Sequence, residues 1–123
     1  MNFSDLKVYN IGLRLVKEIQ TLVDSGSKLR YLKETQQLIR SAASVPANIA
    51  EGFAKKVYPK DFIRFLNIAL GSSDETQCHI AVLYINNNIS QKDYEYFLNQ
   101  YKNLSIKILN LIKAIRKDKN IPF

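Results

Sequence analysis

The sequence predicts an all-α fold: an antiparallel up-down-up-down four-helix bundle in a single domain over residues 1–123. Three observations lead to this prediction. Four stretches repeat apolar residues at steps of three and four, which is the spacing of one helix face. The connections between these stretches are short, which makes consecutive helices antiparallel neighbours. The chain has only four glycines and three prolines, too few for a turn-rich all-β fold.

The first helix is expected from about Phe3 to Val23, and the turn residues 24–27 end it. Its apolar residues form two adjacent stripes, which make a wider face than a single neighbour covers. One stripe is Leu6, Tyr9, Leu13, Val16 and Val23, and the other is Val8, Ile11, Leu15, Ile19 and Leu22. Two stripes exceed what one bundle core requires. We therefore expect part of this apolar surface to be buried between subunits.

The second helix is expected from roughly Leu32 to Phe53, with Pro46 inside it. A proline removes one backbone hydrogen bond, so we predict a bend or a local irregularity there. Four polar residues recur at steps of four, four and three and share one face of this helix: Arg40, Ser44, Asn48 and Glu51. The opposite side is rich in alanine. Small residues of this kind indicate close packing against neighbouring helices.

The third helix is expected to begin near Pro59, a residue favoured in the first helical turn, and to end at residues 86–88, Asn-Asn-Asn. Ser90 then has the properties of an N-cap for the fourth helix, with Asp93 in the first turn. The fourth helix has the most regular pattern of all, and we expect its apolar stripe to face the core. This stripe is Tyr94, Phe97, Tyr101, Leu104, Ile108, Leu111 and Ile115.

A run of small residues surrounds Gly71 in the middle of the third helix. Glycine inside a helix costs about 1 kcal/mol relative to alanine, so we expect a compensating close contact with the alanine-rich part of the second helix. The predicted polar seam between the two helices is Arg40, Ser44, Asn48, Glu51, Gly71, Ser72 and Glu75. A buried polar patch among Asn48, Glu51, Ser72 and Glu75 is the preferred interpretation, and a subunit contact or a ligand site are the alternatives.

The chain is strongly basic, because 18 Lys and Arg against 11 Asp and Glu give a net charge of +7. This balance favours an anionic partner, and nucleic acid held by its phosphates is the candidate. The candidate nucleic-acid-binding residues are Lys102, Lys107, Lys113, Arg116, Lys117 and Lys119 in the fourth helix, and Lys55, Lys56, Lys60 and Arg64 around the connection before the third. A third group is Lys28, Arg30, Lys33 and Arg40. Which groups merge depends on topology and assembly, and the alternative is that all are solvated faces.

Other chemistry has little support in the sequence. His79 is the only histidine, and although Glu75 lies four residues before it, the Zn²⁺ spacing motifs are absent. We therefore predict no metal, no cofactor and no catalytic residues, and a protein that is not an enzyme. The lone Cys78 fits a reducing cytosol, and no apolar run is long enough to span a bilayer. These two observations favour a cytoplasmic location.

Two motifs carry a resemblance to a known family. They are residues 40–52, Arg-Ser-Ala-Ala-Ser-Val-Pro-Ala-Asn-Ile-Ala-Glu-Gly, and residues 62–75, Phe-Ile-Arg-Phe-Leu-Asn-Ile-Ala-Leu-Gly-Ser-Ser-Asp-Glu. Together with residues 3–9 they make the chain resemble bacterial four-helix-bundle proteins that are encoded in intervening sequences of large-subunit ribosomal RNA genes. The accessory variability protein of diversity-generating retroelements is a relative. The resemblance covers nearly the whole chain, with one departure at Ser73, where a larger apolar residue is commoner.

This resemblance implies a four-helix bundle that assembles into a ring-like homopentamer. For the retroelement relative it also implies binding to nucleic acid and to a reverse transcriptase, whereas no catalytic residues carry over. We therefore expect a non-enzymatic, oligomeric helical-bundle protein that binds RNA or DNA through basic surfaces, as an accessory factor to a nucleic-acid enzyme such as a reverse transcriptase. The alternative is a structural or protein-interaction scaffold whose charge serves solubility.

Overall fold

The structure is a computed structural model that describes residues 6–26 and 28–122. It contains four α-helices and one short 3₁₀ turn: α1 (Lys7–Ser25), η2 (Leu29–Tyr31), α2 (Lys33–Ala54), α3 (Pro59–Ile85) and α4 (Gln91–Asp118). The described residues include no β-strand, so the prediction of an all-α fold with four helices is confirmed. The predicted helix start at Phe3 and the turn residue Ser27 lie outside the described residues. The 3₁₀ turn is an element that the sequence patterns did not predict.

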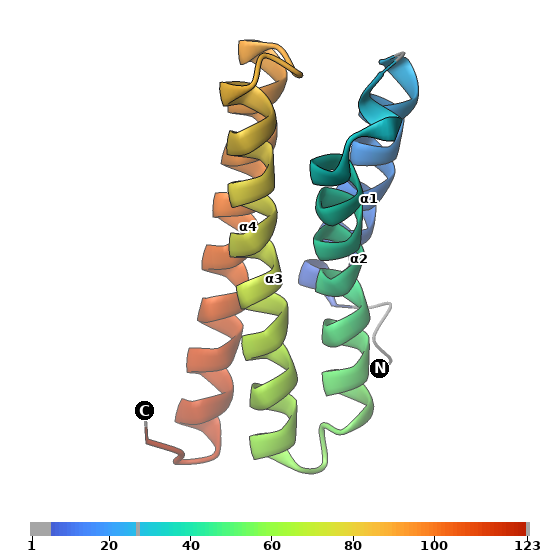
Figure 1. Cartoon of the computed structure of the whole chain (residues 1–123). Coiled ribbons are helices and arrows are strands. Elements are labelled where there is room, and N and C mark those ends of the chain that lie inside the picture. The colour runs from blue at the N-terminus through green and yellow to red at the C-terminus, as the bar shows by residue number, and fades with distance from the viewer. Residues whose placement is uncertain (1–5, 27, 123) are drawn as a thin grey trace.

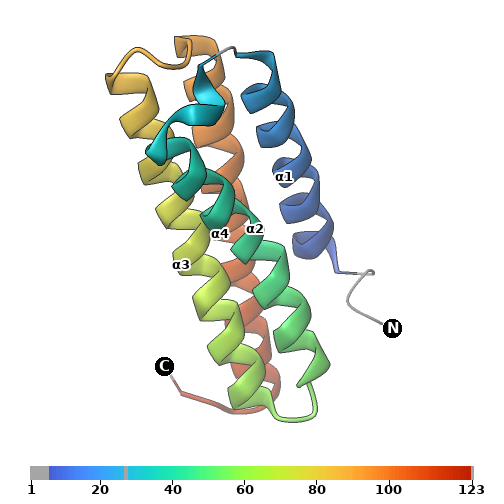
Figure 2. The same ribbon diagram turned by 45° about the vertical axis from the view of Figure 1, so that its right-hand side comes forward.

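The four helices pack side by side in an elongated bundle (Figure 1). α2 contacts α1 and α3, and α4 contacts α3 and α1, so each helix has two neighbours. The links over residues 55–58 and 86–90 lie at opposite ends of the bundle. α1 has 19 residues and α4 has 28. Because α1 is short, α2, α3 and α4 extend beyond its first residues at the end that holds the α2–α3 link (Figure 2).

The core is built from the predicted apolar stripes. α4 buries Phe97, Tyr101, Leu104 and Ile108, as its spacing predicted. The other helices add fully buried side chains: Leu15, Ile19, Leu38, Val45, Ile49, Leu66, Ile80 and Leu83. Burial of apolar surface contributes roughly 25 cal/mol per Å² and is the main term that holds the helices together.

The predicted starts of α3 and α4 are both confirmed. Pro59 is the first residue of α3, where its missing N–H leaves no hydrogen bond unmade. At α4 the N–H of Asp93 donates to Ser90 Oγ at 3.1 Å, which is the expected N-cap bond.

α3 and α4 end in the same way, with an asparagine in the left-handed region: Asn87 at φ 61° and Asn120 at φ 54°. Asparagine tolerates this conformation better than most residues. After Asn120, the N–H of Ile121 donates to the carbonyl of Arg116 at 2.8 Å, which closes a Schellman turn. The turn reverses the chain, and Ile121 packs back against the bundle.

Pro46 is accommodated inside α2, which is continuous through it. The proline is buried and faces Gly12 of α1, where a Cβ atom would lie 3.4 Å from Pro46 Cδ. This distance is an ordinary van der Waals contact, so Gly12 lies directly against the proline ring.

The prediction of a close contact at Gly71 is wrong. A Cβ atom at Gly71 would meet nothing within 4 Å, because this residue lies on the exposed side of α3 while Ser72 and Ser73 face the neighbouring helices. The glycine that permits close packing between α2 and α3 is Gly52. There a Cβ atom would lie 3.0 Å from Phe65 Cβ and 3.2 Å from the carbonyl oxygen of Phe62.

Candidate nucleic-acid interface

The predicted polar seam between α2 and α3 is present in part. The hydroxyls of Ser44 and Ser72 lie 2.8 Å apart, and Asn48 Nδ2 donates to the carbonyl of Ser44 at 2.9 Å. Glu51 does not belong to a buried patch, because its helical position turns it to the exposed side of α2. Gly71 does not belong to the seam either, because it lies on the exposed side of α3.

Two buried polar residues extend the seam beyond its predicted members, and of these Thr76 was predicted only as part of the inward-facing stripe of α3. Thr76 Oγ1 donates to Ser41 Oγ at 2.8 Å, and both side chains are fully buried. Both stand at helical spacing from predicted members, since Ser41 comes three residues before Ser44 and Thr76 four after Ser72. Extending the polar stripes by one turn would have found them.

Further along the same helix pair, four charged or ionisable residues form a paired cluster: Glu34, Arg40, Glu75 and His79. His79 Nδ1 lies 2.7 Å from a Glu34 oxygen, and Nε2 lies 2.9 Å from a Glu75 oxygen. Arg40 also pairs with Glu75. The hydrogen bond from His79, followed by the charge of Arg40, lowers the pKa of Glu75 below its ordinary value.

The two carboxylates of the paired cluster sit on opposite nitrogens of His79, so their oxygens do not converge on one point. Within the described part of the chain, no group of three His, Cys, Asp or Glu side chains could hold a metal ion. The cluster therefore acts as a set of ionic contacts that tie α2 to α3.

Ser73 is also explained by its surroundings, between α3 and α4. It is fully buried, donates to the carbonyl of Tyr101 at 3.2 Å, and lies 2.7 Å from Ser105 Oγ. A polar contact therefore occupies the position where the resemblance led us to expect a larger apolar side chain. Burial raises the pKa of Tyr101 well above its ordinary value, which agrees with its predicted place in the core.

The start of α3 and the end of α4 together form an open hollow of about 580 Å³. It is lined by Tyr58, Pro59, Lys60, Asp61, Lys119 and Ile121. Two smaller hollows adjoin it. One shares Lys60 and Ile121 with it and is also lined by Arg116. The other shares Ile121 with both and Arg116 with the second, and its lining adds Lys113 and Lys117. We call this surface the basic end. Its lining contains five cations, Lys60, Lys113, Arg116, Lys117 and Lys119, and one acid, Asp61.

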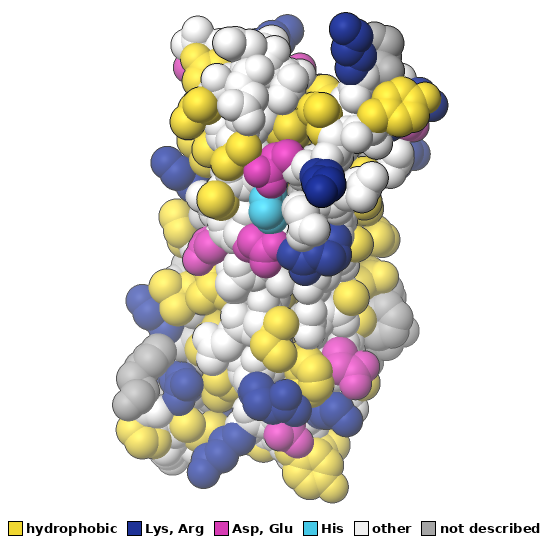
Figure 3. Space-filling model, viewed as in Figure 1, with side chains coloured by type: hydrophobic (Ala, Val, Ile, Leu, Met, Phe, Trp, Pro, Cys, Tyr) yellow, Lys and Arg dark blue, Asp and Glu magenta, His cyan; other side chains and the backbone are white. Residues whose placement is uncertain are grey.

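The basic end brings two of the predicted groups together. Lys60 comes from the group around the α2–α3 link, and the other four cations come from α4. On the face shown in Figure 3, basic side chains lie at the lower end and also in the upper half, where the histidine lies among acidic side chains. The merger follows from the chain path, since the α2–α3 link and the end of α4 lie at the same end of the bundle (Figure 1).

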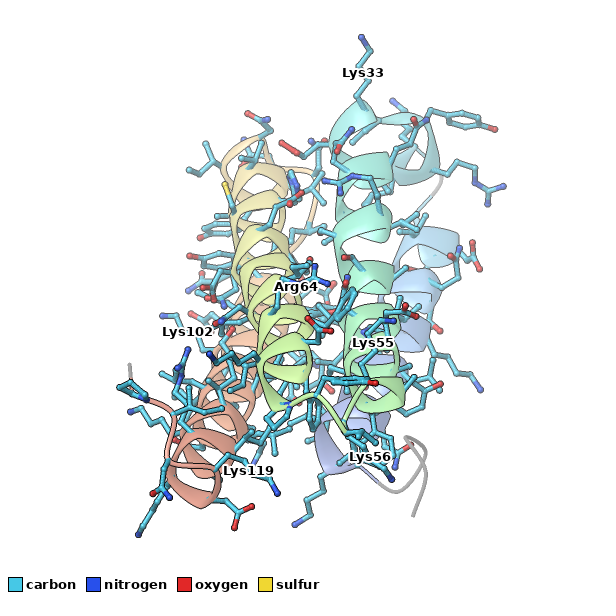
Figure 4. All side chains as sticks on the ribbon, turned by 90° about the horizontal axis from the view of Figure 1, so that it is seen from below. Lys33, Lys55, Lys56, Arg64, Lys102 and Lys119 are labelled. Atoms are coloured by element: carbon cyan, nitrogen blue, oxygen red, sulfur yellow. The ribbon has the colours of Figure 1, made fainter. Side chains whose placement is uncertain are left out.

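Other predicted cations do not line this surface. Lys107 precedes Lys119 by twelve residues, which is about 18 Å along a helix axis at 1.5 Å per residue, and Lys102 projects from α4 away from Lys55 and Lys56 (Figure 4). Lys56 Nζ lies 4.3 Å from the centre of the Phe53 ring. Arg64 lies over the ring of its neighbour Phe65 at 4.4 Å. These four residues and Lys55 are not part of the basic end.

The third basic group lies far from the basic end. Lys28 and Lys33 flank η2 at the other end of α2, and Arg30 lies within η2. Figure 4 places Lys33 at the opposite edge from Lys56 and Lys119. Arg40 belongs to the paired cluster. The structure therefore separates this group from the first two.

Part of one apolar stripe of α1 is open in the single chain, although Val23 of the same stripe is buried. Tyr9, Leu13 and Val16 line a groove of about 300 Å³ with residues of α2 that include Pro46 and Ala47. Leu13 is 48% exposed, although leucine is usually buried. The groove is therefore an apolar surface that the chain does not cover by itself.

The fold and the charge distribution define the class of protein, a basic four-helix bundle with no helix in the described part long and apolar enough to cross a membrane. The profile of the family described as 23S rRNA-intervening sequence protein matches residues 4–110. The chain therefore belongs to this family.

A solved structure supports the same relationship. The crystal structure of a protein of unknown function from the S23 ribosomal protein family of Bacteroides thetaiotaomicron VPI-5482 aligns with a TM-score of 0.79 and 27% sequence identity. The alignment covers 86% of this chain and 95% of that one. Among curated proteins, no significant match is found.

Proposed function

We propose that this protein is a non-enzymatic, oligomeric bundle that binds nucleic acid through its basic end. The observation that carries the proposal is that Lys60 from one predicted group and four cations from the other line three adjoining hollows, with a single acid in the lining. Such a surface neutralises phosphates, and each neutralised phosphate releases condensed counterions. The basic end does not resemble a recognition helix with base-reading side chains, so we expect weak sequence preference.

The direct test is fluorescence anisotropy of labelled RNA and DNA oligonucleotides against the wild-type protein at several salt concentrations. Affinity should fall with salt, with a slope of log K against log salt of about −0.7 per phosphate for single strands and about −0.9 for duplex DNA. Absence of binding to RNA and to DNA at a low salt concentration of about 50 mM would refute the proposal.

We also propose that the protein is a homo-oligomer, and specifically a pentamer, with the apolar groove between α1 and α2 buried between subunits. The open stripe of Tyr9, Leu13 and Val16 supports burial in an assembly, and the number of subunits rests on the family resemblance. Light scattering during size exclusion should give a mass near five times the 14.2 kDa of the chain. Leu13→Glu should lower this mass and Lys17→Glu should not, because Lys17 lies outside the groove lining. A monodisperse wild-type monomer at tens of micromolar would contradict the assembly.

The order of the helices that we propose is antiparallel up-down-up-down. Two short links support it, and so do the contacts between α2 and α3, in which residue numbers rise on one helix as they fall on the other. Glu34 pairs with His79, Arg40 with Glu75 and Ser44 with Ser72.

The cellular role that we propose is that of a cytoplasmic accessory factor to a nucleic-acid enzyme such as a reverse transcriptase. This role rests on the resemblance to the accessory protein of diversity-generating retroelements. Co-purification with a reverse transcriptase encoded beside the gene would test it. Lack of a stable complex would leave the binding of nucleic acid as the function.

A protein-interaction scaffold is the second candidate function. The observation that favours it is the apolar groove between α1 and α2, which would take a protein partner while the positive charge maintains solubility. A wild-type protein that binds no nucleic acid and stays monomeric, with its groove available, would favour this candidate over the first.

A further inference from the structure

We propose that the hollow of the basic end is a binding site for single-stranded nucleic acid, in which an unpaired base stacks on Tyr58 and Lys60 and Lys119 contact the neighbouring phosphates. This inference rests on the proposed function and adds to it the class of nucleic acid and the residue that selects it.

Tyr58 presents its ring to solvent from a fixed backbone. The side chain is 66% exposed, and it follows Val57, which is also exposed. The Tyr58 N–H donates to the carbonyl of Lys55 at 2.8 Å, and the Tyr58 carbonyl accepts from the N–H of Phe62 at 3.0 Å. Pro59 restricts the backbone immediately after it. Because the backbone is fixed, binding of a ligand orders only the side-chain torsions of Tyr58, which favours affinity.

The surroundings of Tyr58 match a nucleotide in two respects. Pro59 and Ile121 supply apolar surface, and Lys60 and Lys119 supply positive charge from two different helix ends. A base has two apolar faces and its flanking phosphates are anionic. The volume of about 580 Å³ lies within the range of small-molecule sites, roughly 300–1,000 Å³.

The tyrosine makes the site specific for single-stranded nucleic acid. In a duplex both faces of each base are covered by its stacked neighbours, so a protein ring can stack only on an unpaired base. Stacking between a base and an aromatic side chain depends little on sequence, since every base has a π face. Lysines alone would bind duplexes as well, because they contact only phosphates.

Another exposed tyrosine provides an internal control. Tyr31 is 75% exposed and lies in η2 beside Arg30, but it is not part of the lining of the hollow. Exposure and neighbouring positive charge are thus shared by both tyrosines. Tyr58 differs from Tyr31 in its surroundings, which are the apolar walls of the hollow and cations from two helix ends.

The test compares Tyr58→Ala, Tyr58→Phe and Tyr31→Ala by fluorescence anisotropy, with a labelled 15-nucleotide oligouridine and a 15-base-pair RNA duplex as probes. Tyr58→Ala should weaken oligouridine binding by at least about fivefold, the equivalent of the roughly 1 kcal/mol at the low end for one stacked base. Tyr58→Phe should stay within about twofold of wild type, because the ring is kept. Tyr31→Ala should behave as wild type. Duplex affinity should be unchanged by Tyr58→Ala.

The salt dependence separates this inference from the proposed function. Tyr58→Ala removes no phosphate contact, so the salt slope for oligouridine should equal that of wild type. Normal oligouridine affinity of Tyr58→Ala, or an equal loss on the duplex, would overturn the stacking site while leaving salt-dependent binding in place. A wild-type protein that binds neither probe would instead overturn the proposed function together with this inference.

Discussion

The paired cluster and the basic end are both rich in charge but differ in how that charge is used. In the paired cluster, Glu34 and Glu75 are bound to His79, and Arg40 completes the set, so the charges of α2 and α3 bind each other. At the basic end five cations share a lining with one carboxylate, and Lys119 also pairs with Asp118 at 3.6 Å. The comparison teaches that the net charge of +7 is not spread evenly. We expect changes in the paired cluster to alter stability, and changes at the basic end to alter binding.

The largest expected effect on stability comes from the packing beneath the basic end. Gly52→Leu should destabilise the protein by about 1–3 kcal/mol, because the new side chain must displace Phe62 or Phe65. Gly71→Leu is the matched control, since the same substitution enters open space and should change stability by less than about 1 kcal/mol. Chemical denaturation measures both. Equal losses in the two variants would show that α3 has a neighbour at Gly71 that the single chain lacks.

A smaller effect is expected in the paired cluster. Glu34→Gln should destabilise the protein by about 0.5–1.5 kcal/mol, because it removes the charge from a hydrogen bond to a largely buried His79. Its affinity for nucleic acid should match wild type. Reduced affinity in a protein of unchanged stability would reverse the roles that we assign to the two regions.

The pH dependence of stability tests whether the charges of the paired cluster stabilise the fold. The pKa of Glu75 is lower in the folded chain than its ordinary value of 4.5, through His79 first and then Arg40. Its ionised form therefore stabilises the fold at neutral pH, and this contribution is lost as the pH falls through the lowered pKa. Denaturation at a series of pH values should find Glu75→Gln less stable than wild type at pH 7, with the difference shrinking as the pH falls through the lowered pKa of Glu75. A difference that does not depend on pH would mean that the carboxylate charge contributes nothing.

The smallest effect on stability is expected at the basic end itself. Reversing Lys113, Lys117 and Lys119 to glutamate should change the free energy of unfolding by no more than about 0.5 kcal/mol per position, because all three side chains are exposed. Arg116 is left intact, since its Nη1 donates to the carbonyl of Pro122 at 2.6 Å and fixes the chain after α4. A large loss of stability in thermal or chemical denaturation would mean that these cations are structural.

Features that depend on neighbouring residues in the chain could be predicted from the sequence. The apolar stripe of α4, the Ser90 cap and the asparagines after α3 follow from helical spacing and local hydrogen bonds, and all are present. Gly71 and Glu51 were misplaced because the rotation of each helix about its axis is set by packing against other helices, and small residues give little information about it.

The candidate site could be predicted only in its parts. The two cationic groups are visible as charge in the sequence. Their proximity depends on the path of the chain and on the Schellman turn at Asn120, after which Ile121 lies beside the start of α3. Tyr58 was missed as a candidate ligand-binding residue because a single tyrosine in a link has no pattern around it. Its exposure and its place in the hollow become visible only in three dimensions.

The central claim is that nucleic acid binds at the basic end, and the most direct measurement compares the salt dependence of binding for two charge-matched variants. One reverses Lys113, Lys117 and Lys119 to glutamate, and the other reverses Lys28, Arg30 and Lys33 near η2. Both lose the same net charge, so long-range attraction is weakened equally. With a single-stranded probe, we predict that the first variant flattens the slope of log K against log salt by up to about 2, since each lost phosphate contact contributes about 0.7. The second variant should keep the wild-type slope. Equal slopes in the two variants, or a flatter slope in the second, would contradict the claim.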